Sequence, residues 1–194
     1  RAQYEPGSSL KIFSIGLALD EKLISEETEF YVKDTIEVIE NSCQKDFKGY
    51  KGCYKDFLNH EPYSLSVKEI IERSSNVGTI MATSGLNIVD LENYLKNFGF
   101  SHKTGIELSG ETRGSFEPYN KCTTCLSSLS IGYSINVTQM QMVKAYSIIA
   151  NGGKNVELSL IKSPYNNKNQ NQVINEISSQ KLKNLLINVV DGEN

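Results

Sequence analysis

Apolar residues recur at helical spacing in several stretches of the chain. Between residues 10 and 23 they return every few positions without an intervening proline, directly after Pro6-Gly7, which predicts a buried helix. Two other stretches begin with capping boxes, from Ser66 to Glu69 and from Thr138 to Gln141. In total, five further helices are predicted, at residues 66–71, 76–86, 90–98, 138–150 and 178–190.

Strand signals are fewer and shorter. The candidate strands are residues 29–32, 105–108, 156–162 and 172–175. Two polar, glycine- or asparagine-rich stretches are predicted to be loops, residues 41–63 with room for one short strand and residues 163–172. The chain has neither an internal repeat nor a linker long enough to divide two domains.

The composition limits the classes of function. The chain has 194 residues, of which 39% are hydrophobic and 22% charged, and this is enough for a packed core. A net charge of −3 does not favour a surface for nucleic acid or anionic membranes, and no apolar run approaches the roughly 18 residues of a membrane span. The first residues are not a signal peptide, and without an initiator methionine the chain is expected to be cut from a longer protein.

The four cysteines allow several interpretations. Cys122 and Cys125 form a C-x-x-C motif, which occurs in redox pairs, in zinc sites and in local disulfides. Polar loop residues flank the motif, and a zinc site needs two more ligands, for which the spacing of Cys43 and Cys53 is unusual. This favours thiols without chemistry or a local disulfide. The two histidines exclude a histidine-rich metal site, and we expect neither a metal nor a cofactor.

The strongest candidate for chemistry is Ser8 with Lys11. A Pro-Gly turn brings Ser8 to the start of the buried helix, and Lys11 follows three residues later on the same face. This spacing lets an amine touch the hydroxyl that it deprotonates, provided that burial or a nearby cation lowers the pKa of the lysine. The same spacing occurs without the turn and the apolar helix at Ser42/Lys45, Ser159/Lys162 and Ser178/Lys181, where solvated side chains are the expected explanation.

A second candidate lies at Ser74-Ser75-Asn76. A serine and an asparagine two residues apart at a helix start can relay a proton and hold a substrate amide. Serine and asparagine are also preferred N-cap residues, and Ser134-Ile135-Asn136 repeats the pattern. The tripeptide alone leaves both interpretations open.

Taken in order along the chain, these motifs resemble the transpeptidase domain of monofunctional (class B) penicillin-binding proteins. Glu5 to Lys11 resembles the nucleophile motif of that family, and Ser74 to Gly78 resembles its second motif. Phe98 to Glu111 is similar to the family segment "FGFG–TGIDLPGE", Ile131 to Gln141 to "GYGxxVTPLQ", and Leu185 to Gly192 to the "VVxxGT" stretch. The resemblance extends over nearly the whole chain.

The resemblance implies an α/β (α+β) fold of the serine β-lactamase and penicillin-binding protein transpeptidase type. This chain would supply mostly the helical lobe and the nucleophile helix, with few strands. The implied enzyme is a peptidoglycan D,D-transpeptidase that forms an acyl-serine with D-Ala-D-Ala stem peptides and binds penicillin covalently. Ser8 would be the nucleophile, Lys11 its general base and Ser74 a proton shuttle. Asn76 would hold the substrate amide and orient Lys11, and the backbone N–H of Ser8 would supply half of an oxyanion hole.

The third motif of the family, Lys-Thr/Ser-Gly, is not where the resemblance requires it. Lys103-Thr104-Gly105 has the right residues but lies inside the "TGIDLPGE"-like segment, so a solvated loop lysine is the expected interpretation. The true motif should follow the "VVxxGT"-like stretch, where the sequence ends. We therefore expect residues 1–194 to be a partial transpeptidase domain, truncated at both ends and lacking the C-terminal Lys-Thr-Gly strand.

The resemblance also implies partners and a location. Expected partners are peptidoglycan stem peptides, β-lactam antibiotics and other divisome or elongation proteins, but no nucleic acid. The parent protein would be anchored in the bacterial inner (cell) membrane, with its catalytic domain facing the periplasm or the outside. Ser74 to Gly78 favours the septal, cell-division type over the elongation type. The alternatives are a β-lactam sensor or β-lactamase-like protein on the same fold, and a non-catalytic scaffold that binds divisome partners.

Overall fold

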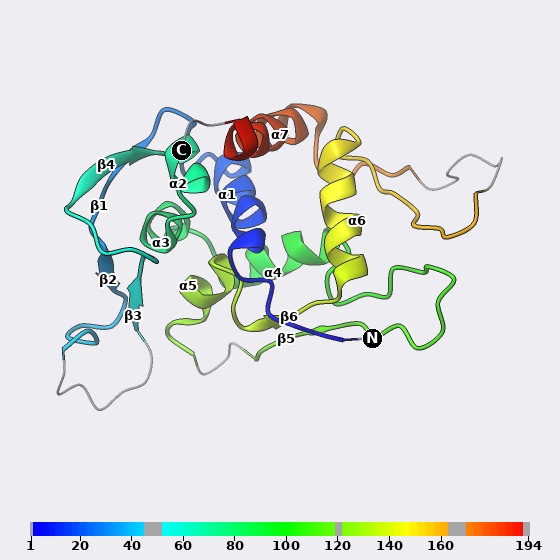
Figure 1. Cartoon of the computed structure of the whole chain (residues 1–194), viewed down its shortest axis with the longest axis horizontal. Helices are drawn as coiled ribbons and strands as arrows, with labels where there is room; N and C mark the ends of the chain where they lie inside the picture. Colours follow the sequence, from blue (N-terminus) through cyan, green and yellow to red (C-terminus); the bar gives the residue numbers. More distant parts are fainter. Residues whose placement is uncertain (1, 45–51, 119–121, 163–169, 192–194) are drawn as a thin grey trace.

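The computed structural model describes residues 2–44, 52–118, 122–162 and 170–191 (Figure 1). Helices account for most of the regular structure in these ranges: η1, a 3₁₀ helix (Gly7–Leu10), α1 (Lys11–Asp20), α2 (Val67–Glu72), α3 (Asn76–Thr83), α4 (Ile88–Asn97), α5 (Cys125–Ser130), α6 (Gln139–Ala150) and α7 (Glu176–Asp191). The strands are short: β1 (Glu29–Val32), β2 (Thr35–Glu37), β3 (Cys53–Lys55), β4 (Tyr63–Ser66), β5 (Ser115–Phe116) and β6 (Ile135–Asn136). The mixture of helices and strands agrees with the expected α/β (α+β) class.

The strands of the described residues pair as separate two-stranded antiparallel sheets. In the first, β1 pairs with β4 and places Val32 opposite Tyr63. In the second, β2 pairs with β3 and places Glu37 opposite Cys53. These two sheets lie on the left in Figure 1, while the third, β5 with β6, lies at the bottom. The sheets therefore flank the helices.

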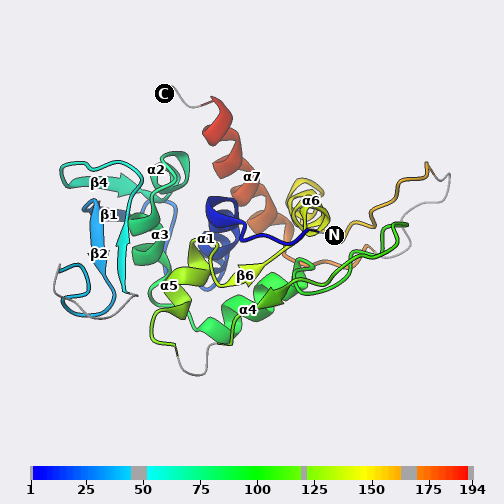
Figure 2. The same cartoon turned by 60° about the horizontal axis from the view of Figure 1, so that its bottom comes forward.

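Helix α1 forms the centre of the hydrophobic core. All its residues from Lys11 to Ala18 are buried, and helices α3, α4 and α7 contact it (Figure 2). The Phe13 ring is fully buried and makes edge contacts with Phe98, Phe100 and Tyr146, at centroid distances of 4.9, 5.6 and 5.4 Å. A helix buried on nearly all sides is fixed by packing, and α1 is the helix that carries Lys11.

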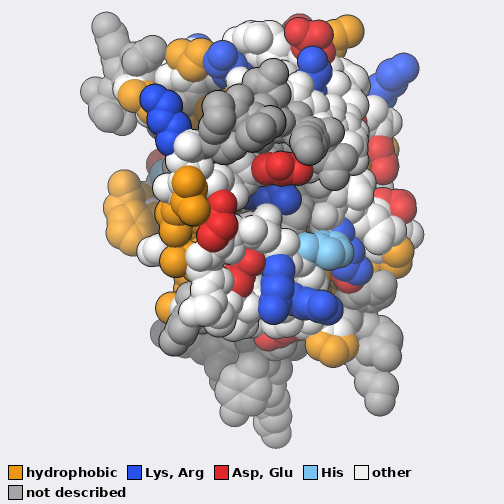
Figure 3. All heavy atoms as spheres, turned by 90° about the vertical axis from the view of Figure 1, so that its right-hand side faces the viewer, with side chains coloured by type: hydrophobic (Ala, Val, Ile, Leu, Met, Phe, Trp, Pro, Cys, Tyr) orange, Lys and Arg blue, Asp and Glu red, His pale blue; other side chains and the backbone are white. Residues whose placement is uncertain are grey.

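Two long loops extend from the helical body, one between α4 and β5 and the other after α6, of which the structure describes residues 151–162 and 170–175. They lie side by side on the right of Figures 1 and 2. The Glu107 carboxylate joins them by accepting hydrogen bonds from the Ser159 hydroxyl (2.6 Å) and from the N–H of Leu160 (3.0 Å). Figure 3 faces this side of the molecule and shows acidic and basic side chains interspersed on it.

The predicted helices are confirmed, with small shifts at their ends. Both predicted capping boxes form, at the starts of α2 and α6. The helix predicted for residues 76–86 ends at Thr83. The last helix begins at Glu176 instead of Ser178, and the side-chain oxygen of Asn175 accepts a hydrogen bond from the N–H of Ser178 (2.8 Å).

Two of the strand predictions are wrong, because residues 105–108 and 156–162 contain no strand. In the first, the Glu111 carboxylate accepts hydrogen bonds from the backbone N–H groups of Thr104 (2.8 Å) and Gly105 (3.1 Å). These bonds fold the segment into a turn instead of an extended strand.

The other strand predictions have mixed outcomes. Residues 29–32 form β1 as predicted, whereas residues 172–175 contribute an isolated bridge between Gln172 and Lys154. The predicted loop at 41–63 contains β3 and the first residue of β4 in its described part. Most of the predicted polar loop, residues 163–169, lies outside the described residues.

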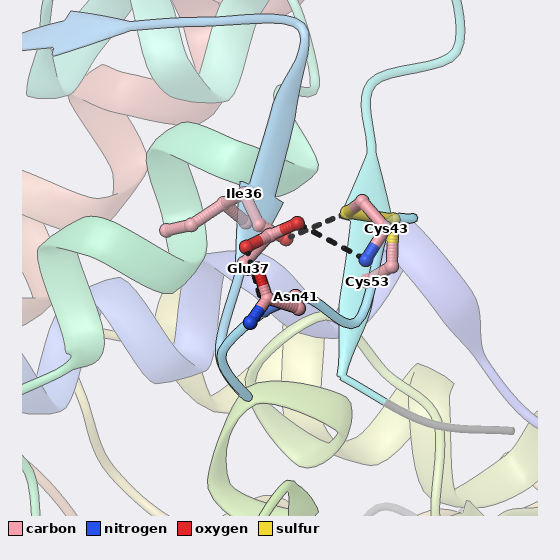
Figure 4. The surroundings of a disulfide bond; sticks show 5 residues. All are labelled: Ile36, Glu37, Asn41, Cys43 and Cys53. Carbon is pink, nitrogen blue, oxygen red and sulfur yellow. Dashed lines mark hydrogen bonds between the residues drawn. A yellow bond between two sulfur atoms is a disulfide. The ribbon is translucent and has the colours of Figure 1, made fainter. Parts of the chain in front are cut away.

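Both cysteine pairs are disulfides, which is the local-disulfide interpretation of the motif. Cys122–Cys125 lies at the start of α5, and Cys43–Cys53 closes the β2–β3 hairpin (Figure 4). The Glu37 carboxylate braces this hairpin by accepting a hydrogen bond from the N–H of Cys43 (3.1 Å). Among the described residues, no cluster of His, Cys, Asp and Glu could hold a metal, and no helix is long and apolar enough to cross a membrane.

Candidate active site

Ser8 lies on the 3₁₀ turn η1, which runs directly into α1. Side chains three residues apart are eclipsed in a 3₁₀ helix, so Ser8 and Lys11 project from the same face. The backbone N–H of Lys11 donates to the carbonyl of Ser8 and closes this turn. Ser8 is exposed, whereas Lys11 is only 2% exposed. An exposed serine therefore lies one turn before a buried lysine, and contact between the hydroxyl and the amine stays a prediction.

A second loop holds the back of this turn. The N–H of Gly7 donates to the carbonyl of Gly132 (3.0 Å), and the Glu5 carboxylate accepts from the N–H of Ser134 (3.0 Å). A Cβ atom on Gly132 would lie 1.9 Å from the Gly7 carbonyl oxygen, and Gly132 has a φ of +85°. Only glycine permits this approach of two backbones, so Gly132 fixes the position of Ser8. The second Ser-x-Asn copy, which begins at Ser134, therefore lies beside the turn that carries Ser8.

The Lys11 ammonium reaches across to the second motif. It donates to the backbone carbonyl of Ser74 (2.5 Å) and to the Ser74 hydroxyl (3.2 Å). Burial lowers the pKa of Lys11 to about 8, and the negative charge of Asp56 opposes this shift. A neutral amine retains two N–H donors for these two bonds and one lone pair for a proton. The geometry therefore suits a lysine that acts as a base near neutral pH.

Ser74 lies in the turn between α2 and α3 and is exposed. Its φ of +54° is unusual for a residue with a side chain and costs roughly 1–2 kcal/mol. The surrounding backbone imposes this conformation, because the N–H groups of Ser74 and Ser75 donate to the carbonyls of Ile71 (3.1 Å) and Ile70 (3.0 Å). The structure thus brings Ser74 to Lys11 across 63 residues of sequence.

Asn76 is the first residue of α3, and its neighbour Ser75 is the N-cap. The Ser75 hydroxyl accepts a hydrogen bond from the N–H of Gly78 (2.8 Å), so the capping interpretation holds for Ser75. The Asn76 amide donates to the carbonyl of Lys55 (2.7 Å), at the end of β3. In this structure Asn76 is therefore anchored to the β2–β3 hairpin, whereas the hydrogen bonds of the Lys11 ammonium go to Ser74.

Asp56 is a further candidate residue that the sequence motifs did not predict. This residue follows β3 in a segment predicted to be irregular loop, and its carboxylate accepts hydrogen bonds from the Ser75 hydroxyl (2.8 Å) and the N–H of Val77 (3.0 Å). A cavity of about 260 Å³ lies beside it and is lined by Asp56, Phe57, Leu58, His60, Tyr63, Arg73, Ser74 and Ser75. A single aspartate in a polar stretch carries no pattern that would have identified it.

The competing Ser-x-x-Lys copies have structural roles or lie partly outside the described residues. The Ser178 hydroxyl donates to the Asp20 carboxylate, and Lys181 forms an ion pair with Glu26 (3.2 Å). At the second copy, the Ser159 hydroxyl donates to Glu107. At Ser42/Lys45, the lysine is outside the described residues.

Lys103-Thr104-Gly105 lies on the loop between α4 and β5 and forms no strand. Lys103 is exposed, while the Thr104 hydroxyl and N–H both donate to Glu111. This agrees with the expectation of a solvated loop lysine beside a turn glycine.

Comparison with known proteins identifies the class. A family model described as the penicillin binding protein transpeptidase domain matches residues 1–194. This chain therefore belongs to the penicillin-binding protein transpeptidase family, and the resemblance found in its motifs is confirmed.

Curated relatives of this chain are larger proteins. Stage V sporulation protein D of Bacillus subtilis is 32% identical over 152 residues, which are 77% of this chain and 22% of that protein. The probable peptidoglycan D,D-transpeptidase FtsI of Caulobacter vibrioides is 25% identical over 98% of this chain and 30% of that protein. The chain thus spans about a quarter of the length of these relatives.

Solved structures share the fold. The crystal structure of penicillin binding protein 3 from Mycobacterium tuberculosis matches with a TM-score of 0.84 at 24% identity, covering 100% of this chain and 43% of that one. A peptidoglycan synthetase from Bifidobacterium adolescentis matches with a TM-score of 0.82 at 24% identity, covering 98% of this chain and 35% of that one. The expected penicillin-binding, β-lactamase-like fold is therefore confirmed.

Proposed function

We propose that this chain carries the acyl-serine chemistry of a peptidoglycan D,D-transpeptidase, with Ser8 as nucleophile and Lys11 as its base. The observation that carries the proposal is a buried lysine one 3₁₀ turn after an exposed serine, bonded to Ser74 at the same time. Relatives named peptidoglycan D,D-transpeptidase FtsI support the substrate class. A complex of Mycobacterium tuberculosis penicillin binding protein 3 with ampicillin supports β-lactam binding.

The proposed reaction uses these positions. Neutral Lys11 takes the proton of the Ser8 hydroxyl as its oxygen attacks the penultimate D-Ala carbonyl of a stem peptide. The backbone N–H of Ser8 stabilises the oxyanion. The C–N bond to the terminal D-Ala then breaks, and the proton passes from Lys11 through the Ser74 hydroxyl to the leaving amine. An amine of a neighbouring strand attacks the Ser8 ester, forms the cross-link and returns the proton to Ser8.

Asn76 completes the proposed set of residues as the one that holds the substrate amide. Its side chain is half-buried, and its N–H₂ group is engaged with the Lys55 carbonyl. The amide oxygen is the atom that would accept a substrate N–H, because an amide side chain offers a donor and an acceptor at once.

We also propose that residues 1–194 are part of a larger transpeptidase domain, whose Lys-Thr-Gly motif lies on a strand elsewhere in the parent protein. The coverage of about a quarter of the two relatives supports this proposal, as does the loop conformation of Lys103-Thr104-Gly105. The proposed parent protein acts in septal cell-wall synthesis at the bacterial inner membrane, with its catalytic domain outside the cytoplasm and divisome proteins as partners. The FtsI relatives favour this septal role over elongation.

The alternatives predict different products. A β-lactamase-like protein would hydrolyse its penicilloyl ester, a sensor would retain it without cross-linking stem peptides, and a scaffold would form no ester. The Thr104–Glu111 and Val137–Gln141 segments together favour the transpeptidase, because sensors and β-lactamases are not expected to carry both.

The proposal is tested by measuring the intact mass of the native full-length protein after incubation with a penicillin. We expect the wild type to gain the mass of one penicillin. Ser8→Ala should gain none. Ser9→Ala is the matched control, since Ser9 is an adjacent exposed serine whose hydroxyl donates to the Pro6 carbonyl (2.8 Å). A wild type without adduct, or an adduct retained in Ser8→Ala, would contradict the proposal.

A further inference from the structure

Asp56 is a carboxylate withdrawn from water at the edge of the candidate site. Its side chain is 8% exposed. One oxygen accepts a hydrogen bond from the Ser75 hydroxyl (2.8 Å) and lies 3.1 Å from His60 Nε2, and the other accepts from the N–H of Val77 (3.0 Å). Burying a carboxylate is costly unless its oxygens are bonded, and here both oxygens are occupied by partners on or near the second motif.

The contacts come from two consecutive residues of the β2–β3 hairpin. The carbonyl of Lys55 holds the Asn76 side chain (2.7 Å), and Asp56 holds Ser75 and Val77. The N–H of Asp56 donates in turn to the carbonyl of Asp34 (2.9 Å), on the opposite side of the hairpin. The hairpin therefore fixes three consecutive residues at the start of α3.

Ser74 directly precedes these fixed residues. Its left-handed backbone turns its carbonyl and hydroxyl toward Lys11. The Ser75 hydroxyl is held by Asp56 on one side and by the N–H of Gly78 on the other. These bonds to Ser75, and not bonds of Ser74 alone, set the direction of the Ser74 carbonyl.

We propose that Asp56 is a positioning residue for the acylation step, acting through Ser75 on Ser74 and through its charge on Lys11. This inference rests on the proposed function, because it assumes that Ser8 is the acylated nucleophile. The Asp56 carboxylate accepts hydrogen bonds from Ser75 and Val77, so its proposed action on the reacting groups is indirect.

The negative charge of Asp56 predicts a shift in the pH dependence of acylation. A role in packing alone would not produce this shift. Asp56 raises the pKa of Lys11 against the lowering caused by burial. Among the described residues, the other ionisable side chains around Asp56 include His60, which is 3.1 Å away, Arg73 and Tyr63, which line the same cavity, and Asp34, which acts on His60. Neutralising Asp56 must therefore move the acid limb of the acylation rate to lower pH, because neutral Lys11 is the reactive form.

The test measures the rate of penicillin acylation against pH for the native full-length protein and for Asp56→Asn. The variant keeps the size of the side chain and removes its charge. We expect a plateau rate lower by roughly ten- to a hundredfold, as misplacement of a reacting group produces, and a midpoint at lower pH than in the wild type. Asp34→Asn is the matched control, since it removes the same charge from the same hairpin without a side-chain contact to Ser75 or Val77 among the bonds described, and it should change neither value.

Ser75→Ala provides the second test, because it removes the proposed link. It should slow acylation, and Asp56→Asn should then add little further loss in the Ser75→Ala background. The proposal is overturned if Asp56→Asn reacts at the wild-type rate, if its midpoint stays in place, or if Asp34→Asn loses as much. If Asp56→Asn does not fold, wild-type acylation by Ser75→Ala overturns it and slowed acylation supports it. A wild type that is not acylated at all contradicts the proposed function and removes the basis of this inference.

Discussion

Helix α1 is joined to the turn before α3 by the hydrogen bonds of Lys11. Different forces hold these two regions in place. The side of α1 that carries Phe13 is enclosed by aromatic rings from Phe98, directly after α4, and from Tyr146 of α6. The turn at Ser74 is held instead by hydrogen bonds: Lys11 donates to Ser74, while Asp56 and the Lys55 carbonyl accept from the two residues that follow it. One side of the site is therefore fixed by burial and the other by a small number of polar contacts.

This difference separates stability from chemistry. The stabilisation from apolar burial is the sum of many weak atom contacts, so the loss of one polar group changes it little. A hydrogen bond depends on the direction of one group. Changes in the apolar side should lower the free energy of unfolding. Changes in the polar side should lower the acylation rate while the melting temperature stays nearly constant.

The largest separation is expected for Lys11→Met. Loss of the base should slow acylation by roughly 10²–10⁴-fold, while the melting temperature at pH 7 stays the same or rises, because a buried ammonium is costly. The pKa of Lys11 is lowered from 10.5 to about 8, so the unfolded state binds the proton more tightly between these values. Wild-type stability should therefore rise with pH in that window, and Lys11→Met should lose this rise. Acylation kinetics and thermal melts at several pH values measure both effects. A lower melting temperature of Lys11→Met at pH 7 would contradict the separation of stability from chemistry.

Phe13→Ala probes the opposite side. Phe13 is fully buried against three aromatic rings, and its truncation should lower the free energy of unfolding by roughly 3–5 kcal/mol. Molecules that remain folded should still be acylated at Ser8. Denaturant titration gives the first value, and the acylated fraction below the melting temperature gives the second. A wild-type free energy of unfolding in Phe13→Ala would show that α1 is not held by burial.

Most of what could be predicted from the sequence lies on the apolar side. Periodicity located α1, and the capping boxes located α2 and α6, because these signals lie within a few neighbouring residues. The Ser8 and Lys11 pair was predictable for the same reason, since one helical turn separates the two side chains.

The polar side was only partly predictable. The motif identified Ser74 and Asn76, but not that Lys11 bonds Ser74 or that Asn76 bonds Lys55. These contacts join segments that are 21 to 63 residues apart. The short strands β2 and β3, which bring Asp56 into place, show no alternation long enough to be recognised.

A smaller effect is expected when the hairpin disulfide is removed with Cys43→Ser and Cys53→Ser together. The change loosens the hairpin that carries Lys55 and Asp56, so acylation should slow by several-fold, less than in Asp56→Asn. The double change Cys122→Ser and Cys125→Ser is the comparison, since that disulfide lies at the start of α5 and outside the hairpin, which meets this region through hydrogen bonds of the Tyr54 hydroxyl with Thr124 and Ser128. The acylation rates of the two double variants are compared. An equal loss in both would contradict the claim that the β2–β3 hairpin positions the second motif.

The smallest effect is expected for Lys103→Ala. Lys103 is an exposed loop residue beside the Glu111-bound turn, so neither acylation nor melting temperature should change measurably. A penicillin acylation rate reduced tenfold or more would mean that this Lys-Thr-Gly, despite its loop conformation, serves as the third motif.

The most direct test of the whole account is the pH dependence of Ser8 acylation in the wild-type, full-length protein. Neutral Lys11 is the proposed base, and burial lowers its pKa to about 8. The rate of penicilloyl-Ser8 formation should therefore rise with pH, with a slope of one proton, and level off above that value. A rate that does not depend on pH, or one that keeps rising toward the ordinary lysine pKa of 10.5, would contradict the claim that a buried, neutral Lys11 activates Ser8.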